Sequence, residues 1–470
     1  MTQLVWLRSD LRVADNPALC AAMGAGPTLA LFLVTPGQWR AHDEAPAKVD
    51  FRLRTLAALA GDLAALGVPL LVRILDTWAE VPATLAALCR ERQVRAVQVN
   101  DEYGADERRR DQAVDAALAD EGVAFQRHLD QTFFPPGSVL TRGGGYFQVF
   151  GQFRKVCRQR LHSALPACLA TPEAQAPLPL AGETPPIALP GFEVSPAIQA
   201  LWPAGEGVAR ERLRSFVEED LGDYHLHRDL PARAGTSGLS AYLAVGALSP
   251  RQCLHGALSA NQGEFDSGRP GAVTWIDELL WREFYRHVLA GYPRVSMHRA
   301  FRRETEALPW RQAPDELLAW QRGLTGFPLI DAAMRQLLAT GWMHNRLRMV
   351  AAMFLSKNLL IDWREGERFF MAHLIDGDLA SNNGGWQWSA STGTDSVPYF
   401  RLFNPLSQSR RFDPQGRFIR QWLPELAGCR DIHQPSVEDR RIAGYPPPLV
   451  DLGESRARAL AAFRDLPRPG

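Results

Sequence analysis

Four short apolar runs within the first 133 residues constrain the fold more than any other feature of this chain. They are LVWL (4–7), LALFLV (29–34), PLLVRI (69–74) and AVQVN (96–100). Runs of this kind, without polar alternation, are typical of strands that are covered on both faces in a parallel sheet. The amphipathic stretches between them, such as 51–66 and 106–121, predict helices that lead from one strand to the next. The sequence therefore predicts a doubly wound α/β domain over 1–133, without the G-x-G-x-x-G of a standard dinucleotide-binding fold.

A proline-rich stretch separates this domain from a helical one. Prolines recur throughout 134–205, which predicts a long interdomain connector, with a short helix at 147–161. From 206 to 470 the pattern is mostly helical, so we expect an all-α C-terminal domain. The expected helices there are 241–248, 275–289, 316–323, 328–340, 342–360 and 366–374. Most of the 13 tryptophans lie in this half, which a large helical core by itself would explain.

Composition and charge restrict the setting in which the chain works. Lys plus Arg balance Asp plus Glu at 52 each, so any basic surface for nucleic acid has to be local. One stretch, 401–420, has five arginines against one acid, Asp413, although a solvated arginine-rich face explains it equally well. The six cysteines form no C-x-x-C pair, and neither a secretory signal nor a membrane-length apolar run is present. We therefore expect a cytoplasmic protein without a zinc site or a disulfide framework.

The stretch DGDLASNNGGWQWSAS (376–391) carries the strongest functional signal. Its Asp and Asn side chains offer directed hydrogen bonds, and the Gly384–Gly385 pair allows close approach of the backbone to a bulky group. Trp386 and Trp388 add π-faces for stacking or for donating an electron. This combination suits a flat heterocyclic cofactor beside a flat heterocyclic substrate.

Three further segments mix aromatic and polar residues in the same way. TSGLS (236–240) precedes an apolar helix with Ser240 as candidate N-cap, and such helix starts bind phosphate, although a plain cap explains it as well. In WIDELLWREFYR (275–286), Glu278, Trp281, Arg282 and Tyr285 fall on one helical side. An exposed ion-pair ladder is the alternative there, and the two tryptophans disfavour it. The third segment is GWMHNRLRM (341–349).

Together these segments resemble the photolyase/cryptochrome family, and most closely its bacterial class I cyclobutane pyrimidine dimer photolyases. The resemblance extends nearly from end to end. It is carried by LVWLRSDLRVADNPAL (4–19), GALSPRQC (246–253), WREFYRH (281–287), TGWMHNRLRM (340–349), DWREGERFF (362–370), DGDLASNNGGWQWSASTGTD (376–395), FRLFNP (400–405) and FIRQWLPEL (418–426).

The resemblance implies that the helical domain binds FAD in a folded conformation. The matching FAD contacts are Tyr224, Thr236, Ser237, Gly238, Leu239, Ser240, Trp275, Arg282, Asp376, Gly377, Asp378 and Asn382. Asn382 would lie beside flavin N5, where plant-type cryptochromes tend to have Asp, so it favours repair over signalling. A hydrogen-bonding role inside a helix or turn is the alternative for Asn382.

The resemblance also implies a chain of tryptophans and a substrate pocket. Trp310, Trp363 and Trp386 match the tryptophans that re-reduce the flavin, since indole is easily oxidised; packing in a core is the alternative. Trp281 and Trp388 match the aromatic walls of the substrate pocket. The remaining pocket contacts match Arg228, Glu278, Asn345, Arg346, Met349 and Gln408.

The expected substrate is a pyrimidine dimer flipped out of DNA, as base-flipping enzymes including photolyases require. Glu278 in an apolar, aromatic site should have a raised pKa and could donate a hydrogen bond to a thymine carbonyl. Arg346 and the 401–420 arginines would hold phosphates, with a structural ion pair as the alternative for Arg346. Relatives that repair the (6-4) photoproduct would have histidines at Asn345 and Met349, so the sequence favours cyclobutane dimers.

An antenna chromophore is also implied, methenyltetrahydrofolate in preference to a deazaflavin, with His42, Asp106 and Glu107 as contacts. First-turn helix charges are the alternative interpretation of the two acids. Asp106 stands where the closest relatives tend to have Asn, and Met297 where a lysine is expected. Gly238 departs in the same way, because a basic residue is common there.

The sequence thus predicts light-driven repair of cyclobutane pyrimidine dimers by electron transfer from excited reduced FAD, without a metal. One alternative is a cryptochrome-type photoreceptor without repair activity, and another is a two-domain flavin oxidoreductase. The expected partner is UV-damaged DNA, duplex or single-stranded, with no membrane and no obligate protein partner. We expect a cytoplasmic monomer that associates with the nucleoid when it is bound to damage.

Overall fold

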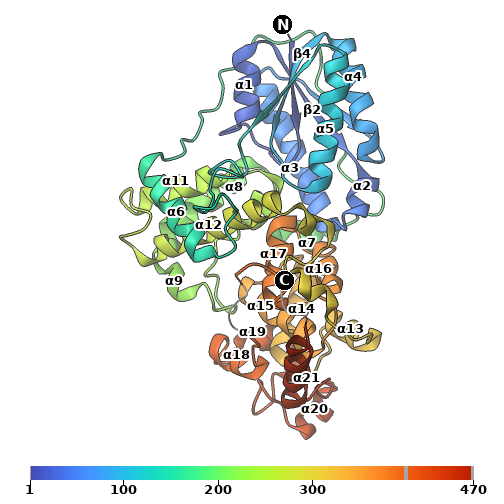
Figure 1. Cartoon of the computed structure of the whole chain (residues 1–470), viewed down its shortest axis with the longest axis vertical. Helices are drawn as coiled ribbons and strands as arrows, with labels where there is room; N and C mark the ends of the chain where they lie inside the picture. The colour runs from blue at the N-terminus through green and yellow to red at the C-terminus, as the bar shows by residue number, and fades with distance from the viewer. Residues whose placement is uncertain (1, 396–400, 467–470) are drawn as a thin grey trace. The chain divides into compact units, whose positions relative to one another are not determined.

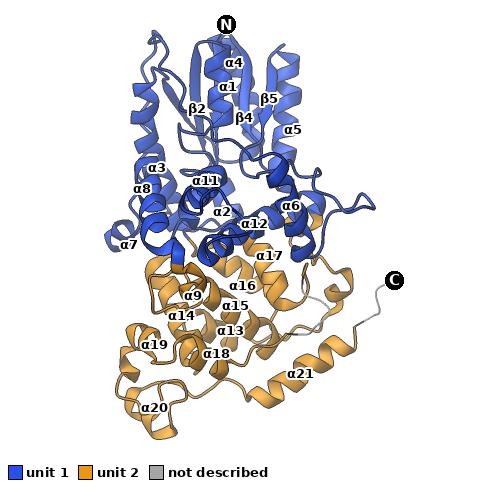
Figure 2. Ribbon diagram, turned by 90° about the vertical axis from the view of Figure 1, so that its left-hand side faces the viewer, with its two compact units in different colours: residues 1–222, 237–293, 375–378 blue, residues 223–236, 294–374, 379–470 orange. Residues whose placement is uncertain are grey.

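The computed structural model describes residues 2–395 and 401–466, which divide into two compact units (Figure 2). Unit 1 comprises Met1–Gly222, Ser237–Pro293 and Ile375–Asp378. Unit 2 comprises Asp223–Thr236, Arg294–Leu374 and Leu379–Gly470. The predicted division at 133 and 205 follows composition and remains a prediction. Phe400 of the FRLFNP motif and the last four residues lie outside the described residues.

Unit 1 contains a five-stranded parallel sheet in the order β3-β2-β1-β4-β5 (Figure 1). The strands are β1 (Thr2–Leu7), β2 (Thr28–Val34), β3 (Leu70–Ile74), β4 (Val94–Asn100) and β5 (Ala124–His128). The first four coincide with the four apolar runs. β1 lies in the middle, and the chain adds strands first on one side and then on the other. The strand order therefore reverses between β1 and β4, where doubly wound folds bind ligands.

β5 was not predicted from the sequence. Its residues AFQRH form no apolar run, and Ala124, Gln126 and Arg127 are largely exposed. β5 pairs only with β4, so it is the edge of the sheet. An edge strand does not need the continuous apolar character that identified the other four.

Helices cover both faces of the sheet, which confirms the predicted doubly wound fold class. Leu4 and Trp6 of β1 pack with Leu85 of helix α4 and Val114 of helix α5 in one core. Helix α1 contacts β1, β4 and β5, and helix α3 contacts β3. The bounds are α1 (Pro17–Ala25), α2 (Pro36–Ala41), α3 (Pro46–Ala65), α4 (Val81–Arg92) and α5 (Ala105–Asp120).

The remainder of unit 1 is helical. Its helices are α6 (Phe150–Ser163), α7 (Pro196–Leu201), α8 (Glu206–Ser215), α10 (Ser240–Val245), α11 (Pro250–Ala260) and α12 (Pro270–Gly291). Buried ion pairs join them to the α/β part: Arg251 of α11 bonds Asp15 at 2.9 Å and Asp130 at 2.8 Å, and Arg12 also bonds Asp130. Burial of all four side chains requires this pairing, because an isolated charge would be costly there.

Unit 2 is entirely helical in its described part. Its helices are α9 (Tyr224–His227), α13 (Pro314–Gln321), α14 (Pro328–Thr340), α15 (Asn345–Met353), α16 (Trp363–Met371), α17 (Leu379–Ala390), α18 (Pro405–Phe412), α19 (Arg417–Trp422), α20 (Val437–Ala443) and α21 (Leu452–Arg464). α15 continues into a π-helical turn at Phe354–Asn358, a feature that is frequent at functional sites. Trp320, Trp363 and Trp386 lie in one buried core of this unit. Among the described helices of the chain, none is long and apolar enough to cross a membrane.

Candidate cofactor and substrate sites

Helix α17 carries three predicted site residues. Asn382 is half-buried, Trp386 is buried one turn later, and Trp388 is half-buried. Residues four apart share one side of a helix, whereas Trp388 points elsewhere. One helix therefore fixes the distances between the amide of Asn382 and the indoles of Trp386 and Trp388.

The Asn382 side chain is oriented by the preceding helix. Its Nδ2 donates to the backbone oxygen of Glu367 at 3.0 Å, which is the helix-interior role of the alternative interpretation. This bond leaves Oδ1 as the atom that can accept from a ligand. The neighbouring Asn383 is instead fully engaged, donating to Glu367 Oε1 and accepting from Gln387 Nε2, both at 2.8 Å.

Cationic groups in unit 1 surround the predicted Asp378. Arg286 pairs with Asp378 at 2.7 Å, and the nearby Arg282 donates to the backbone oxygen of Gln131 at 2.6 Å. Burial, reinforced by Arg286, lowers the pKa of Arg282 to about 9. Arg282 makes no ion pair with any described residue. A desolvated guanidinium of this kind fits the negatively charged diphosphate of FAD.

The TSGLS segment differs from one expectation. Leu239, not Ser240, occupies the N-cap of α10, and Ser240 is the first helical residue with an exposed side chain. Neither residue caps the helix through its side chain, so the N-cap prediction for Ser240 was wrong. The Leu239 N–H donates instead to Ser237 Oγ at 3.4 Å, a local turn that satisfies the backbone before the helix starts.

Gly238 adopts φ +60°, a left-handed conformation that favours glycine. A Cβ there would lie 2.5 Å from Nη2 of Arg212, whose Nε donates to Ser237 O at 3.2 Å. Arg212 of α8 therefore places a positive charge next to Gly238, the position where a basic residue was expected from the sequence.

Helix α12 confirms that Glu278, Trp281, Arg282 and Tyr285 belong to one helix. None of the four is fully exposed, so the alternative of an exposed ion-pair ladder does not apply. One face of Trp281 is covered by Phe150, with ring centroids 3.7 Å apart and an interplanar angle of 12°. The predicted Trp275, also on α12, is buried against Phe216 of the π-helical turn Phe216–Asp220.

Unit 2 brings several other predicted substrate contacts together. Arg346 pairs with Asp229 at 2.9 Å and lies 4.5 Å from the ring centre of Phe412, so the structural ion pair exists. Its Nη1 also lies 3.9 Å from Met349 Sδ. Asn345 is exposed at the first position of α15, which His344 caps. Burial lowers the pKa of His344 to about 4, so this histidine is neutral near pH 7.

Two aromatic side chains and a glutamine complete the predicted contacts in unit 2. The Arg401 guanidinium lies 5.5 Å from the ring centre of Trp388, and that of Arg228 lies 5.7 Å from Tyr224. The Oε1 atom of Gln408 is buried and accepts no hydrogen bond from any residue that the structure describes. An unpaired buried acceptor costs free energy, so a ligand donor at Gln408 would be favourable.

The three predicted electron-transfer tryptophans lie in one core cluster, with Trp363 and Trp386 buried and Trp310 half-buried at its edge. Trp386 approaches α16 so closely that a Cβ on Gly366 would lie 2.0 Å from its Cη2 atom. The indole nitrogens of all three have no hydrogen-bond partner within residues 2–395 and 401–466. Core packing and electron transfer are compatible roles for such residues.

The predicted antenna residues meet at the carboxyl ends of the strands. His42 Nε2 lies 3.2 Å from Asp106 Oδ2, and its ring makes an edge contact with Trp78 at 5.0 Å. Asp106 and Glu107 also occupy the first turn of α5, as the alternative interpretation expects. Burial, with repulsion from Glu102, raises the pKa of Glu107. His42 and Glu107 line a cavity of about 80 Å³, whereas Met297 is exposed in unit 2.

Sequence reasoning missed the other residues of this cavity. They are Trp6, Leu7, Arg8, Ser9, Phe32, Leu33, Thr35, Trp39, Glu44, Arg52, Trp78, Val81 and Arg110. Several follow directly after β1 and β2, so the rule that ligands bind beyond strand carboxyl ends would have found them. Arg212 and Lys357 were also missed; as one of only three lysines in the chain, Lys357 was a visible signal.

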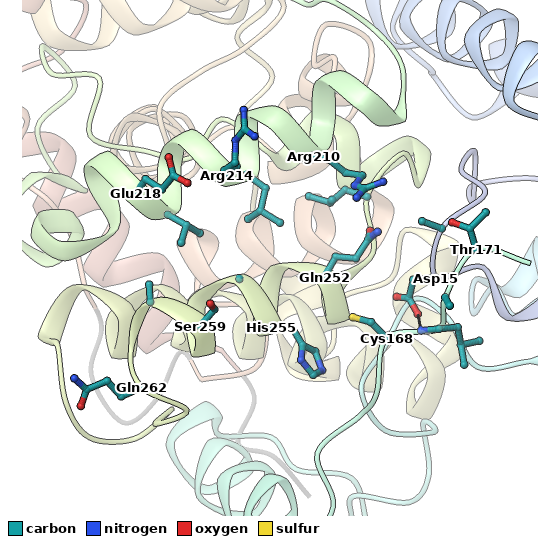
Figure 3. A pocket seen from close by; sticks show the side chains of 18 of the residues that line it. Asp15, Cys168, Thr171, Arg210, Arg214, Glu218, Gln252, His255, Ser259 and Gln262 are labelled. Carbon is teal, nitrogen blue, oxygen red and sulfur yellow. Dashed lines mark hydrogen bonds between the residues drawn. The ribbon is translucent and has the colours of Figure 1, made fainter.

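A larger groove of about 930 Å³ in unit 1 contains no predicted site residue. Figure 3 shows two of its walls: Arg210 and Arg214 on α8, with Glu218 in the π-helical turn Phe216–Asp220 that follows, line one, and Gln252 and Ser259 on α11 line the other. Arg210, Arg214 and Glu218 are exposed and carry charges of both signs. Of the residues that line the groove, Asp15 is described above, and it pairs with Arg251.

Comparisons with known proteins cover nearly the whole chain. Residues 3–173 match the family model described as DNA photolyase, and 275–465 match that described as FAD binding domain of DNA photolyase. A deoxyribodipyrimidine photo-lyase of Salmonella typhimurium is 45% identical over 469 residues, covering 98% of both chains. The structure of a class III photolyase from Agrobacterium tumefaciens is 32% identical, with TM-score 0.88 over 98% of this chain and 97% of that one. The structure of a Synechocystis cryptochrome is 29% identical to this chain, with TM-score 0.89 over 98% of this chain and 99% of that one.

Proposed function

The chain belongs to the DNA photolyase family, and we propose that it repairs cyclobutane pyrimidine dimers through the residues described above. Curated relatives that match along nearly their full length are named deoxyribodipyrimidine photo-lyases, which supports this enzyme activity over the cryptochrome alternative. The chain is a light-dependent DNA repair enzyme that binds FAD.

The FAD contacts follow the family's motif. Arg282 and the Ser237–Ser240 hydroxyl segment would hold the charged part of the cofactor, and Asn382 would present Oδ1 to the flavin ring. FAD, when bound, supplies the blue-light-absorbing, one-electron donor of the reaction. The protein's contribution is orientation: the Glu367 carbonyl fixes the Asn382 amide, and the Arg286–Asp378 pair holds its segment in place.

The substrate contacts act on a dimer flipped out of DNA. Its distorted, poorly stacked bases leave the duplex at lower cost than normal bases, which is a source of selectivity. Trp281, whose one face is already covered by Phe150, offers its other face, and Trp388 supplies a second indole. Glu278 would donate a hydrogen bond to a thymine carbonyl if it is protonated, and the arginines of unit 2 would hold phosphates.

Trp386, Trp363 and Trp310 would return electrons to the site from the surface. The gradient from buried Trp386 to half-buried Trp310 supports this direction, because positive charge is better stabilised near water. The repair reaction itself returns its electron and does not require these residues.

We further propose a folate antenna at His42, Asp106 and Glu107. The cavity of about 80 Å³ that His42 and Glu107 line lies at the carboxyl ends of the strands, where doubly wound folds bind ligands, and this position supports a ligand site there. Protonated Glu107 could donate to a pteridine ring. We also propose that the protein acts as a monomer in the cytoplasm and associates with the nucleoid when it is bound to damaged DNA.

One observation supports the assignment of roles: α17 holds the half-buried amide of Asn382, the buried indole of Trp386 and the half-buried indole of Trp388 on one helix. The test is repair of an oligonucleotide with one thymine cyclobutane dimer, in light and in darkness, beside a (6-4) photoproduct. We expect repair of the cyclobutane dimer only, and only in light. Flavin photoreduction without repair would favour the photoreceptor, and dark turnover with a nicotinamide would favour an oxidoreductase.

A further inference from the structure

Trp386 contacts a fourth tryptophan that belongs to none of the predicted sites. The ring of Trp320, on α13, lies with its centroid 6.0 Å from that of Trp386 and at an interplanar angle of 73°. Trp320 is completely buried. Within the described chain, the rings that contact Trp386 are those of Trp320 and Phe370, and indole is far more easily oxidised than benzene.

Trp320 differs from the three predicted electron-transfer tryptophans in its hydrogen bonding. Its Nε1–H donates to the backbone oxygen of Ala351 at 3.1 Å, whereas Trp310, Trp363 and Trp386 have unpartnered indole nitrogens. The negative end of a carbonyl dipole at the indole nitrogen stabilises positive charge on the ring, and low polarity strengthens the effect. Trp320 is therefore a favourable place for positive charge that starts on Trp386.

We propose that Trp320 is a reversible electron donor to oxidised Trp386, in parallel with the route through Trp363. This inference rests on the proposed electron-transfer role of Trp386. One electron passes from Trp320 to the Trp386 radical cation, so that Trp386 becomes neutral and Trp320 becomes the radical cation. No bond forms or breaks.

The surroundings of Trp320 make this branch a dead end. A backbone carbonyl is a very weak base, so the Ala351 oxygen does not remove the indole proton, and the buried ring has no contact with water. The other rings that Trp320 contacts in the described chain are Phe369 and Phe370, which do not pass the charge onward. The electron therefore returns from Trp386 to Trp320, and the branch stores charge instead of exporting it.

The test compares Trp363→Phe with Trp363→Phe/Trp320→Phe in the FAD-loaded protein by polarised transient absorption. In the single variant the radical cation should be shared by two indoles, with rotated polarisation and a slow phase of recombination. In the double variant the slow phase and the rotation should be lost. Equal decay and polarisation in the two variants would overturn the proposal.

A matched control is Trp363→Phe/Trp422→Phe, because among the described rings that of Trp422 contacts Phe418, whereas Trp386 contacts Trp320 and Phe370. It should keep the slow phase. Electron paramagnetic resonance of frozen Trp363→Phe alone provides a measurement that needs no change at Trp320: part of the radical should show a hydrogen-bonded indole N–H. A radical with only unbonded N–H would also overturn the branch. Absence of any tryptophan radical in the wild type would instead reject the electron-transfer role itself.

Discussion

Lys357 donates a hydrogen bond to Ser391, with Nζ and Oγ 2.8 Å apart, from a position with no exposed surface. The same Nζ donates to the backbone oxygen of Arg401, whose guanidinium lies over Trp388. A buried amine of the π-helical turn thus supports two residues next to a proposed wall of the substrate pocket.

Lys357 should make stability depend on pH. Burial, with repulsion from Arg401, lowers its pKa from 10.5 to about 7 in the folded protein. Between these values the unfolded chain binds more protons, so the free energy of unfolding rises with pH by up to about 1.4 kcal/mol per pH unit. Denaturant unfolding between pH 6 and 10 should show this rise in the wild type and not in Lys357→Met. Lys155→Met, at an exposed lysine, should behave as the wild type; parallel curves for all three would contradict the prediction.

Gly238→Ala should destabilise the protein by about 1–2 kcal/mol, since φ +60° strains an L-residue and the new Cβ meets Arg212. Gly263→Ala is the control, because Gly263 has φ +85° with open space around it. The excess loss at position 238, measured by urea unfolding, reports the contact with Arg212. Equal losses would mean that Arg212 moves away freely.

Trp386→Phe should abolish photoreduction of oxidised flavin while pre-reduced enzyme keeps most of its repair activity. The physical reason is that phenylalanine fills the space beside Gly366 but is not oxidised. Steady-state photoreduction and a repair assay on the same preparation measure both effects. An equal loss of both activities would refute an electron-transfer role for Trp386.

Glu278→Ala should reduce the repair yield several-fold with a smaller effect on DNA affinity, because the proposed hydrogen bond acts in the reaction. Glu278→Gln keeps a donor of similar size and should retain more of the yield than alanine does. Quantum yield and equilibrium binding are the two measurements. An unchanged yield in Glu278→Ala would remove Glu278 from the chemistry.

Arg346 is bonded to Asp229 in the structure, so phosphate binding would have to compete with this pair. If Arg346 holds a phosphate, Arg346→Ala should weaken DNA binding and reduce its salt slope by about one. Asp229→Asn should then strengthen binding by releasing the guanidinium. If both variants leave the salt slope unchanged and only lower stability, the role of Arg346 is structural.

Local sequence patterns predicted most elements because their cause is local. The four apolar runs became β1 to β4, and helices occur at each place where helical periodicity indicated one. β5 was missed because most of its side chains are exposed and it has no apolar run, whereas β3, at the other edge, begins with buried leucines. Ser240 was a wrong N-cap prediction because residue type alone does not fix where a helix starts, and Leu239 occupies the N-cap position.

What the sequence determined by itself was the family, the fold class and the residues with the right chemistry, since these depend on periodicity and on motifs of adjacent residues. Only the tertiary structure decided that Arg212 lies against Gly238, that Lys357 is buried beneath Ser391 and that Trp320 touches Trp386. Each of these relationships joins residues that are distant in the chain. Packing of the whole core brings them together, and no local pattern encodes that packing.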